Sequence, residues 1–169
     1  IVKNLKRCIT VDMYVWGGNH KAGIPEMLEY YPPSGPLSEE TRKRWMLKGL
    51  DCSGLLYECA DGYTPRNTSA LVRYGRAVAI RGLTAEQIQR RLEPLDLIVW
   101  EGHVIVVLDQ SHTIESRNRY AVDIQGADSG VRIRKTEHVL REIMRHRIPV
   151  NDYRRGEGER RFVARRWYP

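Results

Sequence analysis

Apolar residues recur along the chain with two different spacings. Between residues 52 and 62 they follow a helical repeat, which Gly62 closes. Residues 97–100 and 104–108 are instead short, continuous apolar runs separated by a Glu101-Gly102 turn. Such runs are typical of the buried strands of a hairpin. The pattern therefore predicts an α+β fold.

Capping residues mark where further helices begin. Ser38 can cap a short charged helix, and Thr84 followed by Gln87 forms a capping-box pattern. We expect helices at residues 38–48, 52–62, 67–74, 84–93 and 138–146. We expect strands at residues 97–100, 104–108, 113–117, 131–135 and 161–167, with a loop at 125–130.

No internal repeat, low-complexity tract or linker interrupts the 169 residues. With 41% hydrophobic residues, the chain has enough apolar material for one core of ordinary size. We therefore expect a single domain over residues 1–169. Its three cysteines, Cys8, Cys52 and Cys59, cannot all pair within the chain, so at least one thiol is left over.

The formal net charge of +7 favours anionic partners, such as nucleic acid, an acidic membrane surface or the acidic polymers of a cell envelope. Much of the excess comes from arginines near the end of the chain: Arg154, Arg155, Arg160, Arg161, Arg165 and Arg166. We interpret this arginine-rich segment as a solvated face or an edge strand. No stretch approaches the roughly 20 apolar residues of a membrane span, and the start shows no signal-peptide pattern.

Cys52 falls in the first turn of the helix expected at residues 52–62. A thiol there faces unpaired backbone N–H groups and the positive end of the helix dipole, which both favour thiolate over thiol. Gly49 and Gly54 permit a tight entry and a close approach of a substrate backbone. Taken alone, such a cysteine is more often a small, inert core residue. We assign that inert role to Cys59.

A cysteine nucleophile needs a base, and the base needs a group that fixes its orientation. His103 stands at the start of a buried strand, and Glu115 follows the next hairpin turn. Antiparallel strands joined by a short turn can bring the two together, with the carboxylate accepting from one ring nitrogen while the other faces the thiol. The remaining histidines show no comparable partners and are interpreted as structural: His20, His112, His138 and His146.

Short blocks around these residues resemble, in order, those of the NlpC-type papain-like cysteine peptidases. The blocks are Tyr14-Val15-Trp16-Gly17-Gly18, Gly49-Leu50-Asp51-Cys52-Ser53-Gly54-Leu55, Pro65-Arg66-Asn67-Thr68-Ser69, Leu92-Glu93-Pro94-Leu95-Asp96-Leu97-Ile98, Gly102-His103-Val104 and Ile114-Glu115. The resemblance covers roughly residues 14–117. It implies a papain-like core, in which a helix that bears the cysteine packs on a central antiparallel sheet.

The resemblance also assigns roles to single residues. It implies that Cys52 is the nucleophile and His103 the general base, with Glu115 as the orienting group. Tyr14 matches a tyrosine that helps to hold the oxyanion beside the backbone N–H of Cys52. Further positions match the substrate-binding cleft: Asp51, Ser53, Trp16 and Arg66, the last with either a structural or a substrate-facing role. Neither a metal nor another cofactor is implied.

Two features depart from the family pattern. The third catalytic position is often histidine, whereas this chain has Glu115, and a carboxylate would hold an imidazolium more strongly. An insertion at about residues 19–48 lengthens the segment after Gly18 and carries the aromatic residues Tyr30, Tyr31 and Trp45. We expect it either to border the cleft and alter specificity or to form a surface loop.

The resulting hypothesis is a bacterial cysteine peptidase that cuts peptidoglycan stem peptides, most often between D-glutamate and the diamino acid, through a thioester acyl-enzyme. We expect peptidoglycan peptides as partners, no nucleic acid and no transmembrane segment. The expected location is the cell wall, the periplasm or the exterior, with cytoplasmic peptide recycling as the alternative. A second hypothesis is an amidase or acyltransferase that uses the same Cys-His site on another amide or lipid. A third is a basic, non-catalytic binding module. The oligomeric state stays open.

Overall fold

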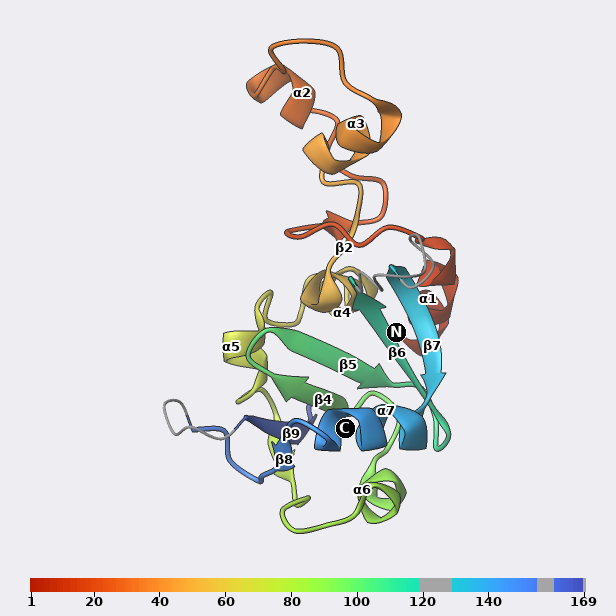
Figure 1. Cartoon of the computed structure of the whole chain (residues 1–169), viewed down its shortest axis with the longest axis vertical. Coiled ribbons are helices and arrows are strands. Elements are labelled where there is room, and N and C mark those ends of the chain that lie inside the picture. Colours follow the sequence, from red (N-terminus) through yellow and green to blue (C-terminus); the bar gives the residue numbers. More distant parts are fainter. Residues whose placement is uncertain (119–128, 155–159, 169) are drawn as a thin grey trace. The chain divides into compact units, whose positions relative to one another are not determined.

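The computed structural model describes residues 1–118, 129–154 and 160–168. It consists of helices and a mostly antiparallel sheet (Figure 1), so the predicted α+β class is confirmed. Residues 125–128 of the expected loop, and Arg155 of the arginine-rich segment, lie outside the described residues.

The chain separates into two compact units, and each is built from segments that lie far apart in the sequence. The first unit consists of Lys3–Thr64 and Ser116–Arg132 together with Ile1. The second consists of Pro65–Glu115 and Ile133–Pro169 together with Val2. The expectation of a single domain stays a prediction.

Short helices dominate the first unit. Its elements are α1 (Val2–Arg7), the 3-10 helix η1 (Cys8–Thr10), β1 (Asn19–His20), α2 (Met27–Tyr30), α3 (Glu39–Trp45), β2 (Gly49–Leu50) and α4 (Cys52–Cys59). Ser38 caps α3, because its Oγ accepts a hydrogen bond from the backbone N–H of Thr41 at 3.2 Å. Gly62 closes α4 with a φ of 79°, and its N–H donates to the carbonyl of Tyr57 at 2.9 Å. Both helices predicted for this region are therefore present.

The insertion expected at about residues 19–48 is held by contacts of its own. At its base β1 pairs with β2 in antiparallel fashion. Farther along, the N–H of Ile24 donates to the carbonyl of Met46 at 2.7 Å, and the indole N–H of Trp45 donates to the carbonyl of Tyr31 at 2.7 Å. These bonds explain why a segment without large buried side chains still folds back on itself. Its relation to a substrate cleft stays a prediction.

The second unit contains most of the sheet. Its elements are α5 (Thr68–Leu71), β3 (Arg76–Val78), α6 (Ala85–Arg91), β4 (Leu97–Trp100), β5 (His103–Val107), α7 (Thr136–Met144), β8 (Ile148–Pro149) and β9 (Arg161–Arg166), with parts of β6 (His112–Arg117) and β7 (Gly130–Lys135). The strand order is β3-β9-β4-β5-β6-β7, and β8 pairs in parallel with β9. The predicted hairpin is present as β4 and β5, which pair in antiparallel fashion around the turn at Gly102.

The core of the second unit lies between helices and sheet. Helices α6 and α7 lie side by side (Figure 1). The buried cluster draws on α6, α7, β4, β5, β9 and the segment before α6: Ile80, Ala85, Ile88, Leu92, Ile98, Ile105, Val107, Val139, Leu140, Ile143, Phe162 and Ala164. The predicted capping box at the start of α6 is present, with Thr84 Oγ1 accepting from the N–H of Gln87 at 3.3 Å and Gln87 Oε1 accepting from the N–H of Thr84 at 2.9 Å.

The arginine-rich segment does not form an edge strand. β9 lies between β3 and β4, and Phe162, Val163 and Ala164 in its middle are fully buried. The expectation of an edge strand is therefore wrong. Its physical basis was the density of charge, but three consecutive apolar residues give the strand two faces that are favourable to bury.

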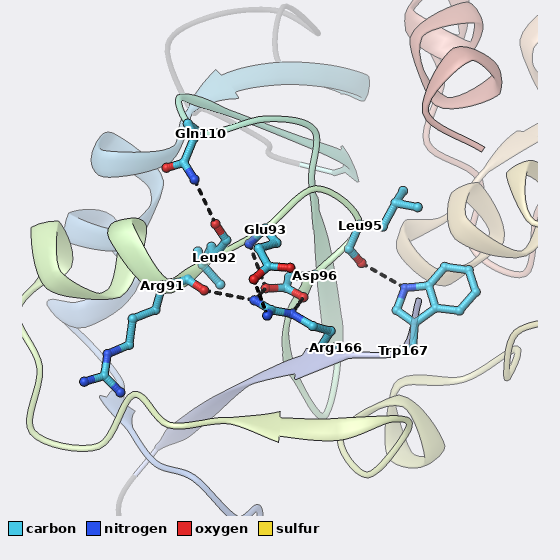
Figure 2. Close-up of polar contacts among 8 residues, drawn as sticks. All are labelled: Arg91, Leu92, Glu93, Leu95, Asp96, Gln110, Arg166 and Trp167. Carbon is cyan, nitrogen blue, oxygen red and sulfur yellow. Dashed lines mark hydrogen bonds and ion pairs between the residues drawn. The ribbon is translucent and has the colours of Figure 1, made fainter. Parts of the chain in front are cut away.

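The charges at the end of β9 are matched inside the second unit (Figure 2). Arg166 forms a two-pronged ion pair with Asp96, with Nε 2.8 Å from Oδ1 and Nη2 2.7 Å from Oδ2. The buried carboxylate of Asp96 also accepts the backbone N–H of Glu93 at 2.8 Å. Beside it, the indole N–H of Trp167 donates to the carbonyl of Leu95 at 2.8 Å. The block at residues 92–98 therefore fastens β4 to β9.

Candidate active site

Cys52 is the first residue of α4, and its N-cap is Asp51. One carboxylate oxygen of Asp51 accepts from the N–H of Gly54 at 2.7 Å and from the hydroxyl of Ser53 at 3.3 Å. The other oxygen accepts from the N–H of Gly17 at 3.0 Å. Asp51 is only 6% exposed, so protein donors take the place of water around its charge. Asp51 and Ser53 thus hold the start of the helix, and their role in substrate binding stays a prediction.

Two of the sequence blocks meet backbone to backbone in the first unit. The N–H of Asp51 donates to the carbonyl of Gly18 at 2.9 Å. A Cβ atom on Gly54 would lie 2.0 Å from that same carbonyl oxygen, and one on Gly18 would lie 2.4 Å from the oxygen of Gly49. Only glycine permits such an approach. Gly18 and Gly54 are therefore explained by the packing that places Cys52.

The other predicted site residues of the first unit are Tyr14 and Trp16. Tyr14 is half-buried, and its backbone N–H donates to the hydroxyl of Ser129 at 3.3 Å. Trp16 is 84% exposed, which leaves its indole accessible to solvent. The first unit therefore contains Cys52, Tyr14, Trp16 and the Asp51 cap, all on the two blocks that the glycine contacts join.

His103 and Glu115 lie together in the second unit. Nε2 of His103 is 2.6 Å from Oε2 of Glu115, and the two side chains are 18% and 4% exposed. The pairing follows from the register of β5 and β6, in which Val106 lies opposite Ile114. Continuing that register makes His103 and Glu115 diagonal neighbours on one face of the sheet. The structure thus brings together the pair that the sequence suggested.

The carboxylate of Glu115 has a second partner that the sequence did not suggest. Arg134, on β7, donates from Nη1 to Oε1 of Glu115 at 3.0 Å. Its other terminal nitrogen bonds to Glu142 on α7. Burial works to lower the pKa of Arg134, but the contacts with Glu142 and Glu115 outweigh it and raise the pKa of the guanidinium above its ordinary value. Glu115 therefore lies between a permanent cation and the imidazole of His103.

Further contacts surround the ring of His103. The indole of Trp100 packs on it, with ring centroids 5.2 Å apart, and the guanidinium of Arg147 lies 4.5 Å from the centroid of Trp100. The turn before His103 is anchored by Thr68, whose Oγ1 accepts from the N–H of Gly102 at 2.9 Å.

Arg66 lies in the second unit, just before Asn67, the N-cap of α5, and it is half-buried. Its choice between a structural and a substrate-facing role stays open. The structure therefore divides the predicted site residues between the units: Cys52, Tyr14, Trp16, Asp51 and Ser53 in the first, and His103, Glu115 and Arg66 in the second.

Two of the other histidines also lie beside a carboxylate, although not in a comparable buried setting. Nδ1 of His20 is 2.8 Å from Glu58, and Nδ1 of His112 is 3.0 Å from Asp109. Both rings are about half exposed, at 51% and 45%, so water screens these ion pairs. Among these three pairs, that of His103 and Glu115 is the buried one.

Across residues 1–118, 129–154 and 160–168, there is no cluster of three or more histidine, cysteine or acidic side chains placed to ligate a metal ion. Within the same residues, none of the helices has the length and apolar character that a membrane crossing requires.

The fold and the two groups of residues can be compared with known proteins. No family model and no curated protein sequence matches the chain. Among solved structures, the chain is similar to the P60 domain of an antigen from M. avium subspecies paratuberculosis. The TM-score is 0.51 at 20% sequence identity, and the match covers 97% of this chain and 90% of that one. The likeness shows that the two chains share a fold.

Arg134 and Glu142 are the site residues that sequence reasoning missed. The expected strand at 131–135 contains two arginines, Arg132 and Arg134, on the same side of an alternating pattern. An arginine on a strand that lies beside a buried strand needs a buried acidic side chain as its partner. That signal was present, but it did not identify Glu115 as the acid.

Proposed function

We propose that the protein is a cysteine peptidase that hydrolyses amide bonds in peptidoglycan stem peptides. The observation that carries the proposal is the buried hydrogen bond between His103 and Glu115, with 2.6 Å between Nε2 and Oε2. A carboxylate that accepts from Nε2 leaves the proton on that nitrogen and makes Nδ1 the basic one. This is the arrangement that a general base of a thiol nucleophile requires.

In the proposed mechanism, Nδ1 of His103 takes the proton of Cys52. The sulfur attacks the carbonyl carbon of the substrate, and the tetrahedral oxyanion is held by the backbone N–H of Cys52 and the hydroxyl of Tyr14. The imidazolium then gives its proton to the departing amine as the C–N bond breaks, which leaves a thioester on Cys52. Water attacks the thioester with His103 again as base, and the acid product and the thiol are released.

Similarity of fold supports the choice of substrate. The similar solved structure is named a P60 domain, and the sequence blocks resemble the NlpC-type peptidases. Stem peptides carry several carboxylates, which suits a chain with a formal charge of +7. The bond between D-glutamate and the diamino acid is the proposed point of cleavage. An exported location is part of the same proposal.

Defined stem peptides test the activity directly. We expect the wild-type chain to release two products whose summed mass exceeds the substrate by one water, as measured by mass spectrometry. Cys52→Ala should abolish this release, and Glu115→Gln should lower turnover by about 10-fold or more, because the neutral amide no longer stabilises the imidazolium. His112→Ala is the matched control, since that histidine also has a carboxylate partner. Products that lack the added water would indicate acyl transfer.

Alkylation tests the pairing of thiol and base without any substrate. Iodoacetamide should label Cys52 well before Cys59, and His103→Ala should slow the labelling of Cys52 at neutral pH. The control His112→Ala should leave the rate unchanged. Equal labelling of both cysteines in the wild-type chain, or a Cys52 rate that is insensitive to His103, would contradict the proposal.

A further inference from the structure

Two thiols meet in the first unit, away from the start of α4. Sγ of Cys8, at the beginning of η1, lies 3.6 Å from Sγ of Cys59, at the end of α4. Both residues are buried, with exposed fractions of 2% and 1%. They are 51 positions apart in the sequence, so the fold and not the local chain brings them together.

The sulfur atoms are already in contact, and a disulfide requires them to approach to about 2.05 Å. Rotations of the two side chains about their Cα–Cβ bonds can share the remaining difference of about 1.5 Å. We propose that Cys8 and Cys59 form an intramolecular disulfide under oxidising conditions, which fastens the segment after α1 to the helix that carries Cys52. The proposal does not depend on the peptidase activity.

The charges around the pair favour the chemistry. The hydrogen bond between Cys8 and Cys59 lowers the pKa of Cys8, and Lys21 acts in the same direction, against the effects of burial and of Glu58. The pKa of Cys59 is raised, first by its bond to Cys8 and then by burial. Cys8 is therefore the better nucleophile of the two, and the thiol of Cys59 holds its proton more firmly.

The reaction is thiol–disulfide exchange with a small disulfide such as oxidised glutathione. The thiolate of Cys8 attacks one sulfur of the reagent, whose S–S bond breaks and releases one glutathione thiolate. The sulfur of Cys59 then attacks the mixed disulfide and transfers its proton to that thiolate, and the second glutathione leaves as a thiolate that takes the proton first released by Cys8. Two cysteine thiols are oxidised while one reagent disulfide is reduced to two thiols.

The cross-link would account for the odd number of cysteines. Oxidation of Cys8 and Cys59 leaves Cys52 as the remaining thiol of the three. A loop of this length, closed by a covalent bond, restricts the unfolded chain strongly. We expect the thermal midpoint to rise by about 5–15 °C on oxidation. Because both cysteines are buried, the reagent reaches their sulfurs through local opening of the structure around them.

The test uses the full chain with Cys52→Ala, in which Cys8 and Cys59 are the thiols that remain. The protein is equilibrated in glutathione buffers from fully reduced to fully oxidised, quenched with acid, alkylated with N-ethylmaleimide and weighed intact. We expect both thiols to disappear together, without a retained glutathione adduct, and a peptide map to show residues 8 and 59 cross-linked. The thermal midpoint should rise in parallel and fall again with dithiothreitol.

Cys8→Ser in the same background is the matched control, and it should show neither the cross-link nor the reversible thermal shift. Should that variant not fold, the mass measurement on the native chain still decides, because wild-type protein should keep one alkylable thiol, at Cys52. Two thiols that stay alkylable in the most oxidising buffer, a stable glutathione adduct on either cysteine, or a cross-link that includes Cys52 would overturn the proposal.

Discussion

The start of α4 in the first unit and the imidazole of His103 in the second are held by different kinds of contact. Backbone groups and one capping carboxylate place Cys52, through hydrogen bonds of Asp51 and through glycines whose Cβ positions are occupied by backbone atoms. Charged side chains place His103, through Glu115 and Arg134. The first arrangement is sensitive to added atoms, whereas the second is sensitive to charge.

This difference shows which conditions the placement of Cys52 and the placement of His103 each depend on. The close approach of the glycines does not depend on ionisation, so this steric part of the first arrangement is the same at any pH at which the unit is folded. Electrostatic placement works only while Glu115 is ionised, and Arg134 supports that ionised form. Variants that add atoms or remove charges test this difference between the start of α4 and the imidazole of His103.

The largest effect should come from Gly54→Ala. The new methyl carbon would lie 2.0 Å from the carbonyl oxygen of Gly18, so the two blocks must separate. We expect a loss of more than about 3 kcal/mol in the free energy of unfolding, measured by urea denaturation. Gly35→Ala is the control, because no atom lies within 4 Å of its Cβ position. Equal effects of the two substitutions would show that close packing does not hold the start of α4.

Arg134→Ala should have the next largest effect. It leaves the buried carboxylate of Glu115 without its cation, and we expect a loss of about 3 kcal/mol in stability and about 10-fold in turnover. Because the protonated form of Glu115 is then favoured, the acid limb of the pH–rate profile should move to higher pH. Arg134→Lys keeps the charge and should move that limb back. A profile that is the same in all three proteins would remove Arg134 from the placement of His103.

Asp51→Ala should cost about 2 kcal/mol, because it leaves backbone N–H groups of Gly54 and Gly17 without their acceptor. Asp51→Asn keeps one acceptor oxygen and should lose less. Thermal denaturation of the two variants separates the hydrogen bonds of the cap from its charge. If the asparagine variant is as unstable as the alanine variant, charge and not hydrogen bonding holds the start of α4.

The smallest effect should come from Asp109→Asn, in the turn that leads from β5 to β6. The backbone N–H of Ser111 lowers the pKa of Asp109 below its ordinary value, and His112 adds to the effect. A lowered folded-state pKa stabilises above the unfolded value of about 3.9 and loses that contribution as pH falls through the folded value. The variant keeps the acceptor, so at pH 7 its stability should be within about 0.5 kcal/mol of wild type. Urea denaturation at pH 7 and pH 3 should show the difference shrinking at low pH, and a difference that grows would reverse the assigned sign.

Local sequence was sufficient for the elements that depend on neighbouring residues. The cap of α3 by Ser38, the capping box of α6 and the hairpin of β4 and β5 are present as predicted. Each follows from side chains within a few positions of the backbone groups that they satisfy. The placement of His103 beside Glu115 also belongs here, because one short turn sets the register of the two strands.

The sequence by itself determined the helices α3, α4 and α6, the hairpin of β4 and β5, and which residues could serve as nucleophile, base and orienting group. Tertiary structure decided the partners that come from distant segments: Arg134 for Glu115, Asp96 for Arg166 and Cys59 for Cys8. It also placed β9 inside the sheet instead of at its edge. The physical reason is that a charge or a thiol lowers its free energy with any suitable partner, and only the order of the strands and the packing of the helices selects which one it meets.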